Sequence, residues 1–399
     1  MKRFLVPFLA LLLLPPVAAA GSFDQVRALL SPSDSALVVA EDGEVLFSWK
    51  PDAPRVPASI LKILTSLAAL KHWGPKHRFA TEVYVDLEDS CAIKGFGDPL
   101  LVSEVLEKMA AEVAEKAPGI RRLIVDGSYF DEGVEIPGTG TSENPYDAPA
   151  GALCANFNTV FFTRDPDTGE PVSAEVQTPL IPFSLELIRQ NEVSTGRVLL
   201  ARERGQAALY AGHLFAWFYQ WTGGGKVRDV RTGRVPASFM LLKRFESPFD
   251  LSENVRRLLK YSNNYMANQI LLALGAEKYG PPATLEKGVR ALSTFARQEL
   301  GLEDFTLVEG SGISRENRIT AREMMRVLEA FAPYMDLLDQ DAGVFLKTGT
   351  LNGIRTRAGY VRRDWREPCS FVIMLNTPGA DPYGVMEWVL RALPPREPG

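Results

Sequence analysis

The chain has 399 residues, of which 46% are hydrophobic and 23% charged, and its formal net charge is −5. This length predicts two or three domains with ample apolar residues for their cores. No basic stripe of the kind that nucleic-acid binding requires is present in the sequence, which excludes that class of partner.

The first 20 residues have the three parts of a secretory signal peptide. Met1-Lys2-Arg3 supply positive charge, residues 4–17 are apolar, and Ala18-Ala19-Ala20 form a small-residue end. The apolar run is short and is broken by Pro15 and Pro16, which argues against a membrane-spanning anchor. We predict cleavage after Ala20, export of the mature chain, and membrane association that is peripheral at most.

A β-hairpin is predicted within residues 37–47, and Pro-rich coil leads from it to a buried helix. The helix begins at Ser59 and continues through residues 60–70, which contain no Gly or Pro and are apolar on nearly every face. Lys62 follows Ser59 by one turn, so its amine can lie near the hydroxyl. A buried lysine of lowered pKa can take the serine proton. The alternative is that Ser59 is a helix N-cap and Lys62 a surface lysine.

From about residue 77 the pattern changes to strands, and we assign residues 77–244 to one or more inserted domains. A helix is predicted near residues 102–116, and a strand at residues 122–125. Residues 213–221 are predicted to be helical, with their aromatic side chains in a core rather than on a glycan-binding surface. Gly223-Gly224-Gly225 is not followed by Gly-Lys-Ser or Gly-Lys-Thr and is therefore predicted to be a turn, not a phosphate loop.

A Ser-x-Asn pattern occurs three times, beginning at Ser142, Ser252 and Ser262. The first lies in a Gly- and Pro-rich loop, and the second is predicted to be a helix N-cap. Ser262 separates two helical patterns at residues 254–261 and 265–274. We expect Ser262 to hydrogen-bond Lys62 or to relay a proton to a leaving group, and Asn264 to hold a substrate amide and Lys62. The alternative is a polar turn between two helices.

A second hairpin is predicted from residues 344–347 to residues 358–362, and it contains Lys347-Thr348-Gly349-Thr350. Gly349 is expected to leave room for a substrate backbone. Thr348 or Thr350 would then hydrogen-bond a terminal carboxylate, with Lys347 supplying positive charge. The alternative is an ordinary edge strand whose lysine discourages aggregation. A strand at residues 370–375 and a helix at residues 383–393 are predicted to complete this sheet.

Cysteines and histidines are few. The three cysteines, Cys91, Cys154 and Cys369, show no metal-ligand spacing; buried thiols are expected, and the sequence does not choose a pair for a disulfide. The three histidines, His72, His77 and His213, argue against both a Ser-His-Asp triad and a histidine-rich zinc site. No metal or organic cofactor is expected.

The order of these motifs, together with further blocks, resembles the D-alanyl-D-alanine carboxypeptidase/endopeptidases, the class C low-molecular-mass penicillin-binding proteins of peptidase family S13. The blocks run in family order across nearly the whole mature chain. They occupy residues 57–65, 95–100, 126–131, 145–149, 261–268, 309–315 and 347–360.

The resemblance implies an α/β (α+β) fold of the β-lactamase/transpeptidase-like serine hydrolase type, formed by residues 21–76 and 245–399 around the insertion. It implies that Ser59 is the acylated nucleophile, Lys62 its general base, and Ser262 and Asn264 the second element. Lys347 and Thr348 would bind the substrate carboxylate, and the N–H groups of Ser59 and Thr350 would form an oxyanion hole.

By the same resemblance, the expected substrates are peptidoglycan stem peptides in the periplasm, and the expected inhibitors are β-lactams. The sequence does not determine the oligomeric state. Two alternative functions are compatible with part of this pattern. A β-lactamase or esterase would share the site chemistry, but the large insertion argues against it. A non-catalytic peptidoglycan-binding protein would be expected to lose Ser59 or Lys62, and both are present.

Overall fold

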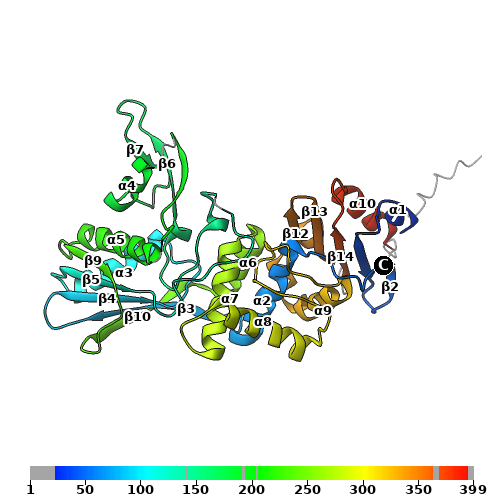
Figure 1. The fold of residues 1–399 in the computed structure, drawn as a ribbon, viewed down its shortest axis with the longest axis horizontal. Helices are drawn as coiled ribbons and strands as arrows, with labels where there is room; N and C mark the ends of the chain where they lie inside the picture. The colour runs from blue at the N-terminus through cyan, green and yellow to red at the C-terminus, as the bar shows by residue number, and fades with distance from the viewer. Residues whose placement is uncertain (1–22, 141, 191–193, 204, 363–367, 394–399) are drawn as a thin grey trace, which may run out of the picture.

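The computed structural model describes residues 23–140, 142–190, 194–203, 205–362 and 368–393, so the predicted signal peptide lies outside it. One end of the molecule is a six-stranded antiparallel sheet with the order β11-β12-β13-β14-β1-β2 (Figure 1). Its strands are β1 (Ser35–Val39), β2 (Val45–Trp49), β11 (Asp339–Asp341), β12 (Val344–Leu351), β13 (Ile354–Val361) and β14 (Cys369–Leu375). Both predicted hairpins are confirmed.

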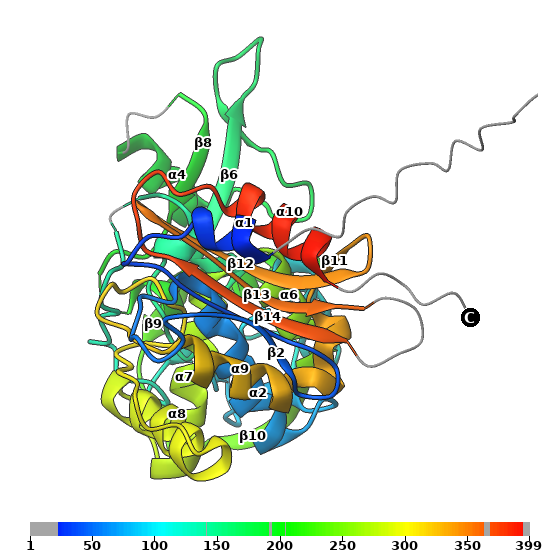
Figure 2. The same ribbon diagram turned by 90° about the vertical axis from the view of Figure 1, so that its right-hand side faces the viewer.

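The two faces of this sheet are covered by different helices. Along β14, Phe371 and Ile373 pack with α1 (Phe23–Ala28) and α10 (Pro382–Ala392). Val372 and Met374 point to the opposite face and join the main core, as the alternation of a strand requires. Figure 2 shows α1 and α10 on one side of the sheet and α2 and α9 on the other.

A layer of helices forms the centre of the molecule. It consists of α2 (Leu61–Trp73), α6 (Leu251–Lys260), α7 (Asn264–Tyr279), α8 (Leu285–Leu300) and α9 (Ala321–Phe331). Every residue of α2 from Leu61 to Leu70 is buried, which explains why this segment is apolar on all faces. The predicted helix is thus confirmed.

The helix α6 is capped differently from the prediction. The side chain of Asp250 accepts a hydrogen bond from the N–H of Glu253, so Asp250 is the N-cap. Ser252 lies inside the first turn, and its prediction as the N-cap was wrong. Asp250 ends the preceding strand in an extended conformation, which a cap residue requires.

The inserted region contains two further sheets. The larger has the order β10-β3-β4-β5-β9 and packs against α3 (Ser103–Lys116) and α5 (Gln206–Trp221). Its strands are β3 (Arg78–Val85), β4 (Ser90–Gly95), β5 (Arg122–Asp126), β9 (Asp229–Thr232) and β10 (Met240–Asp250). The smaller sheet consists of β6 (Thr159–Arg164), β7 (Pro171–Ser173) and β8 (Gly196–Leu199), beside α4 (Pro182–Gln190).

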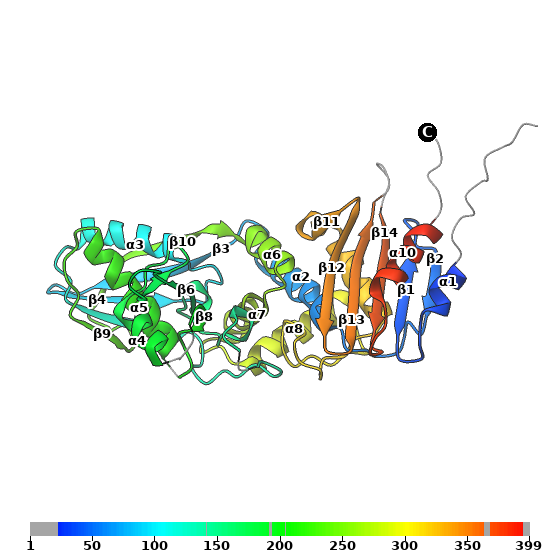
Figure 3. The same cartoon turned by 90° about the horizontal axis from the view of Figure 1, so that it is seen from above.

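The inserted region and the six-stranded sheet lie at opposite ends of the molecule, with the helical layer between them (Figure 3). The predicted domain boundary after residue 244 falls within β10, which pairs with β3 along residues 240–250. Because a strand is one continuous unit of pairing, β10 itself carries the chain back from the insertion into α6.

The aromatic helix α5 shows a partly different burial from the prediction. Phe215, Phe218 and Tyr219 are buried in the core of the inserted region, as expected. Trp217 is 40% exposed and Trp221 77% exposed. These two residues are four positions apart and therefore share the outer face of the helix, so the prediction of a core position was wrong for both.

Two of the cysteines, Cys91 and Cys154, are buried free thiols. Burial raises the pKa of both, that of Cys154 to about 11, so they remain protonated at neutral pH. Within the described ranges, no group of His, Cys, Asp and Glu side chains is arranged to hold a metal ion. No helix among these residues is long and apolar enough to cross a membrane.

Candidate active site

Ser59 and Lys62 lie where the chain enters the central helix. Ser59 belongs to a 3₁₀ turn, η1 (Ala58–Ile60), that leads directly into α2. Lys62 is completely buried, and its Nζ lies 2.9 Å from the Ser59 Oγ. The tight turn and the one-turn spacing therefore bring the hydroxyl and the amine together, as the sequence predicted.

Two other groups contact the same amine. Lys62 Nζ donates hydrogen bonds to the Asn264 Oδ1, at 2.6 Å, and to the main-chain oxygen of Ser311, at 2.7 Å. Both oxygens can only accept hydrogen bonds. A neutral lysine amine has two N–H groups and one lone pair, so these two acceptors take both hydrogens. The lone pair is then directed at the third neighbour, the Ser59 hydroxyl.

The electrostatic environment favours this neutral form. Burial holds the pKa of Lys62 well below its ordinary value, and the nearby positive charge of Lys347 lowers it further. The carboxylate of Glu309 acts in the opposite direction. An uncharged amine aimed at a serine hydroxyl can act as a general base and make the oxygen nucleophilic.

The two adjacent asparagines before α7 have different contacts. Asn263 is the N-cap, and its side chain accepts a hydrogen bond from the N–H of Met266. Asn264, the first residue of the helix, is therefore left to contact Lys62. Ser262 is half-buried in a left-handed backbone conformation, with φ of 52°. The three hydrogen bonds of Lys62 go to other residues, so the expected bond from Ser262 to Lys62 is not formed.

Lys347 and the threonines lie on β12. Lys347 is 3% exposed, its Nζ donates to the main-chain oxygen of Thr348 at 2.6 Å, and burial lowers its pKa to about 8. The side chains of Thr348 and Thr350 lie on the opposite face of the strand from that of Lys347 and are exposed. Among the described residues, β11 pairs only with the first three residues of β12, so residues 347–351 have a strand neighbour on one side only. An extended peptide can add along such an edge.

Gly349 allows a close approach between two segments of the protein. A Cβ at this position would lie 2.1 Å from the Thr356 Oγ1 and 2.8 Å from the backbone nitrogen of Ser59. The space on this side of Gly349 is therefore filled by the Thr356 side chain and the Ser59 turn of the protein itself, and the approach of a substrate backbone to Gly349 stays a prediction. The glycine thus seats the serine turn against β12.

The sequence did not identify the contact from Ser311. Its main-chain oxygen reaches Lys62 from a loop at residues 309–312, far along the chain. Gly312 in this loop has φ of +80°, and a Cβ on it would overlap the main-chain oxygen of Ala58. The only available signal was the Glu-Gly-Ser-Gly block itself, because a backbone carbonyl contact leaves no mark on residue type.

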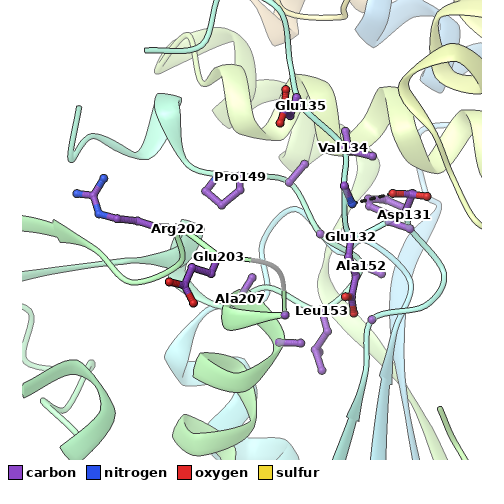
Figure 4. A pocket seen from close by; sticks show the side chains of 17 residues that line it. Asp131, Glu132, Val134, Glu135, Pro149, Ala152, Leu153, Arg202, Glu203 and Ala207 are labelled. Carbon is purple, nitrogen blue, oxygen red and sulfur yellow. Dashed lines mark hydrogen bonds between the residues drawn. The ribbon is translucent and has the colours of Figure 1, made fainter. Parts of the chain in front are cut away.

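A separate pocket of about 220 Å³ lies in the inserted region, where α5 begins (Figure 4). It is lined by acidic residues that include Glu132, Glu135 and Glu203, and by Arg202. None of the predicted site residues lines it. The predicted site chemistry therefore lies outside this pocket, at the junction of α2, α7 and β12.

A serine hydroxyl paired with a buried lysine, next to a Lys-Thr-Gly strand, defines a class of serine acyl-transfer enzymes. The comparisons with known proteins identify the family within this class. The model of the D-Ala-D-Ala carboxypeptidase 3 (S13) family matches residues 28–198 and 193–342. The chain belongs to this family and is a serine-type carboxypeptidase.

One relative is similar in sequence, and two solved structures are similar in fold. A D-alanyl-D-alanine carboxypeptidase of Actinomadura sp. (strain R39) is 26% identical, over 86% of this chain and 78% of that protein. Penicillin-binding protein 4 of Haemophilus influenzae has a similar fold, with a TM-score of 0.73 and 18% identity over 92% of this chain and 98% of that one. A penicillin G-acylated predatory endopeptidase of Bdellovibrio bacteriovorus gives a TM-score of 0.53 and 14% identity over 90% of each chain.

Proposed function

We propose that the mature protein hydrolyses the bond between two D-alanines in peptidoglycan stem peptides through an acyl-enzyme on Ser59. The observation that carries this proposal is the set of contacts of Lys62, whose two acceptor neighbours direct its lone pair at the Ser59 hydroxyl. The curated relative named above is a D-alanyl-D-alanine carboxypeptidase, which supports the same bond as the target.

The reaction is divided among the site residues. Lys62 removes the Ser59 proton as the oxygen attacks the carbonyl, and the N–H groups of Ser59 and Thr350 stabilise the oxyanion. The leaving D-amino acid takes its proton from Lys62 or through Ser262. Water then hydrolyses the ester, and no metal or organic cofactor takes part.

Specificity for a chain end would come from β12. Asn264 holds the substrate amide, while Lys347, Thr348 and Thr350 bind its terminal carboxylate beside the edge at residues 347–351. Cleavage of a peptide with a free terminal carboxylate at this position is carboxypeptidase action. Cleavage of a cross-link between two stem peptides by the same chemistry is endopeptidase action. β-Lactams would acylate Ser59 because they mimic the D-Ala-D-Ala end; the Bdellovibrio endopeptidase is acylated by penicillin G. Residues 1–20 support export to the periplasm.

The proposal is tested by incubating the protein with peptides ending in D-Ala-D-Ala and with cross-linked muropeptide dimers, and by separating the products chromatographically. Release of D-alanine, or of monomers from dimers, is expected from the unaltered protein and not from Ser59→Ala. Release by Ser59→Ala would exclude Ser59 as the nucleophile. Rapid penicillin hydrolysis without cleavage of either peptide would instead identify a β-lactamase.

A further inference from the structure

The loop at residues 309–312 is built around one buried carboxylate that the mechanism above does not use. Glu309 is completely buried. Its carboxylate accepts hydrogen bonds from backbone and side-chain donors within 3.4 Å. The donors are the N–H and Oγ of Ser311, the N–H groups of Gly312 and Ser314, and the side-chain amides of Asn317 and Asn268.

These contacts determine where the Ser311 carbonyl points. Glu309 holds the Ser311 N–H at 2.6 Å and the Gly312 N–H at 2.6 Å, so it fixes the nitrogens at both ends of the Ser311 residue. The carbonyl between them accepts from Lys62 Nζ at 2.7 Å. A buried carboxylate needs such donors to offset the loss of water, and the loop therefore has one stable arrangement.

The same loop is tied to both helices that carry the site. Thr65, one turn beyond Lys62 on α2, donates to the main-chain oxygen of Gly310 at 2.6 Å. Asn268, one turn beyond Asn264 on α7, accepts from the Gly310 N–H at 2.9 Å and donates to Glu309 at 3.1 Å. The loop therefore locks the two acceptors of the Lys62 amine, Asn264 and the Ser311 carbonyl, into one rigid unit.

We infer that Glu309 is a positioning residue, which holds the Ser311 carbonyl as the second acceptor of Lys62 and thereby keeps the lone pair of the amine on the Ser59 hydroxyl. This inference rests on the proposed function. Without the carbonyl, one N–H of the neutral amine is free to turn toward the Ser59 oxygen, and the lone pair turns away. Glu309 thus acts through Lys62 and does not contact the reacting atoms.

The charge of Glu309 gives a second, independent readout. The charged groups that act on Lys62 are Glu309 in the loop and Lys347 on β12, while Asp339 on β11 faces Lys347. On α7, the neighbours of Lys62 and Glu309 are amides. Because the negative charge of Glu309 raises the pKa of Lys62, its removal lowers that pKa. The acid limb of the acylation rate then moves to lower pH.

The test measures the rate of acylation by a fluorescent penicillin as a function of pH, from about pH 5 to about pH 9. The rate is compared among the unaltered protein, Glu309→Gln and Glu309→Asp. Glu309→Gln is expected to lose at least about tenfold in the maximal rate, in the range of a general-base contribution, and to shift the acid limb to lower pH. Glu309→Asp keeps the charge and is expected to keep the acid limb in place. The matched control is Glu323→Gln, another buried carboxylate that accepts backbone hydrogen bonds, but at the start of α9.

A folded Glu309→Gln variant with the rate and the acid limb of the unaltered protein would overturn the inference. The same would hold if Glu323→Gln produced equal changes in both. If Glu309→Gln does not fold, Ser311→Ala removes one hydrogen bond of the carboxylate and leaves the charge; a lower rate with an unmoved acid limb supports the inference, and an unchanged rate overturns it. Failure of the unaltered protein to be acylated would overturn the proposed function first.

Discussion

The site region and the inserted region bury different kinds of residue. Between α2, α7 and β12, the completely or almost completely buried side chains include Lys62, Glu309 and Lys347. Around β5 and α5 the core consists mainly of apolar residues such as Leu123 and Phe215. Asp126, at the end of β5, is also buried, and ion pairs such as Lys243 with Glu112 lie at the surface. Buried charges are costly unless they are paired or hydrogen-bonded. Asp126 accepts backbone hydrogen bonds from Ser128 and Val235, whereas the two buried lysines act on each other beside Ser59.

This difference explains why the sequence predicts function in the site region but only fold in the inserted region. A site that needs buried polar groups places them at fixed spacings on helices and strands, and these spacings are visible in a sequence. The inserted region follows only the periodicity of its helices and strands. Its fold can therefore be predicted in part, whereas its role cannot. The following substitutions test whether function and stability are separated in this way.

The largest effect is expected from Lys62→Met. The substitution keeps an unbranched side chain in the buried position but removes the base, and acylation should fall by about 10²–10⁴-fold. Lys71→Met is the control, since Lys71 is an exposed lysine near the end of the same helix. Acylation by a fluorescent penicillin measures both rates. Equal activity of the two variants would contradict the assigned role of Lys62.

The adjacent asparagines, Asn263 and Asn264, allow a sharper comparison between two consecutive residues. Asn264→Ala removes an acceptor of the Lys62 amine and should lower acylation on the order of 10²-fold, as for other groups that orient a catalytic base. Asn263→Ala removes the helix cap and should reduce the free energy of unfolding by about 1 kcal/mol, with little change in the activity of the folded protein. Thermal melts and acylation rates separate the two. Loss of activity in folded Asn263→Ala, with Asn264→Ala losing stability alone, would contradict the contacts assigned to the two residues.

The pH dependence tests Lys347. Because its pKa is about 8, its positive charge is present below that pH and is lost as the pH rises above it. The kcat/KM for a peptide with a free terminal carboxylate should therefore fall above about pH 8, whereas that for the amidated peptide should not. Lys347→Arg keeps the charge and should remove the fall. A parallel decline for both peptides would exclude carboxylate binding by Lys347.

The inserted region is expected to respond in stability alone. Leu123→Ala opens a cavity in its core and should lower the free energy of unfolding by about 2–5 kcal/mol, with the acylation rate of the folded molecules unchanged.

The smallest effect is expected from Lys243→Ala, which breaks a surface ion pair and should lower the free energy of unfolding by about 0–1 kcal/mol. Denaturant unfolding and acylation measured together check both. Loss of activity in folded Leu123→Ala would couple the two regions.

The sequence predicted the three segments of the candidate site, because Ser59 with Lys62, Asn264, and Lys347 are specified by side-chain chemistry in short motifs. It also predicted the central helix and both hairpins from their hydrophobic patterns. It did not predict the Ser311 carbonyl, since any residue type can present a backbone oxygen. Nor did it predict the role of Gly349, because the turn that packs on it lies about 290 residues away in the chain.

The error in the inserted region, the burial predicted for two tryptophans, has a similar physical origin. The aromatic pattern of residues 213–221 indicated a packed helix, but not which face the sheet covers, so the exposure of Trp217 and Trp221 was missed. The domain boundary after residue 244 stays a prediction. The strand β10 continues to residue 250 because its pairing with β3, and not its composition, determines its length.

The most direct test of the account is the intact mass of the mature protein with and without benzylpenicillin, followed by peptide mapping. We expect a stable increase by the mass of one drug molecule, located on Ser59 and absent from Ser59→Ala. An adduct on a different residue, or one retained by Ser59→Ala, would contradict the assignment of Ser59 and Lys62 as the acyl-transfer pair.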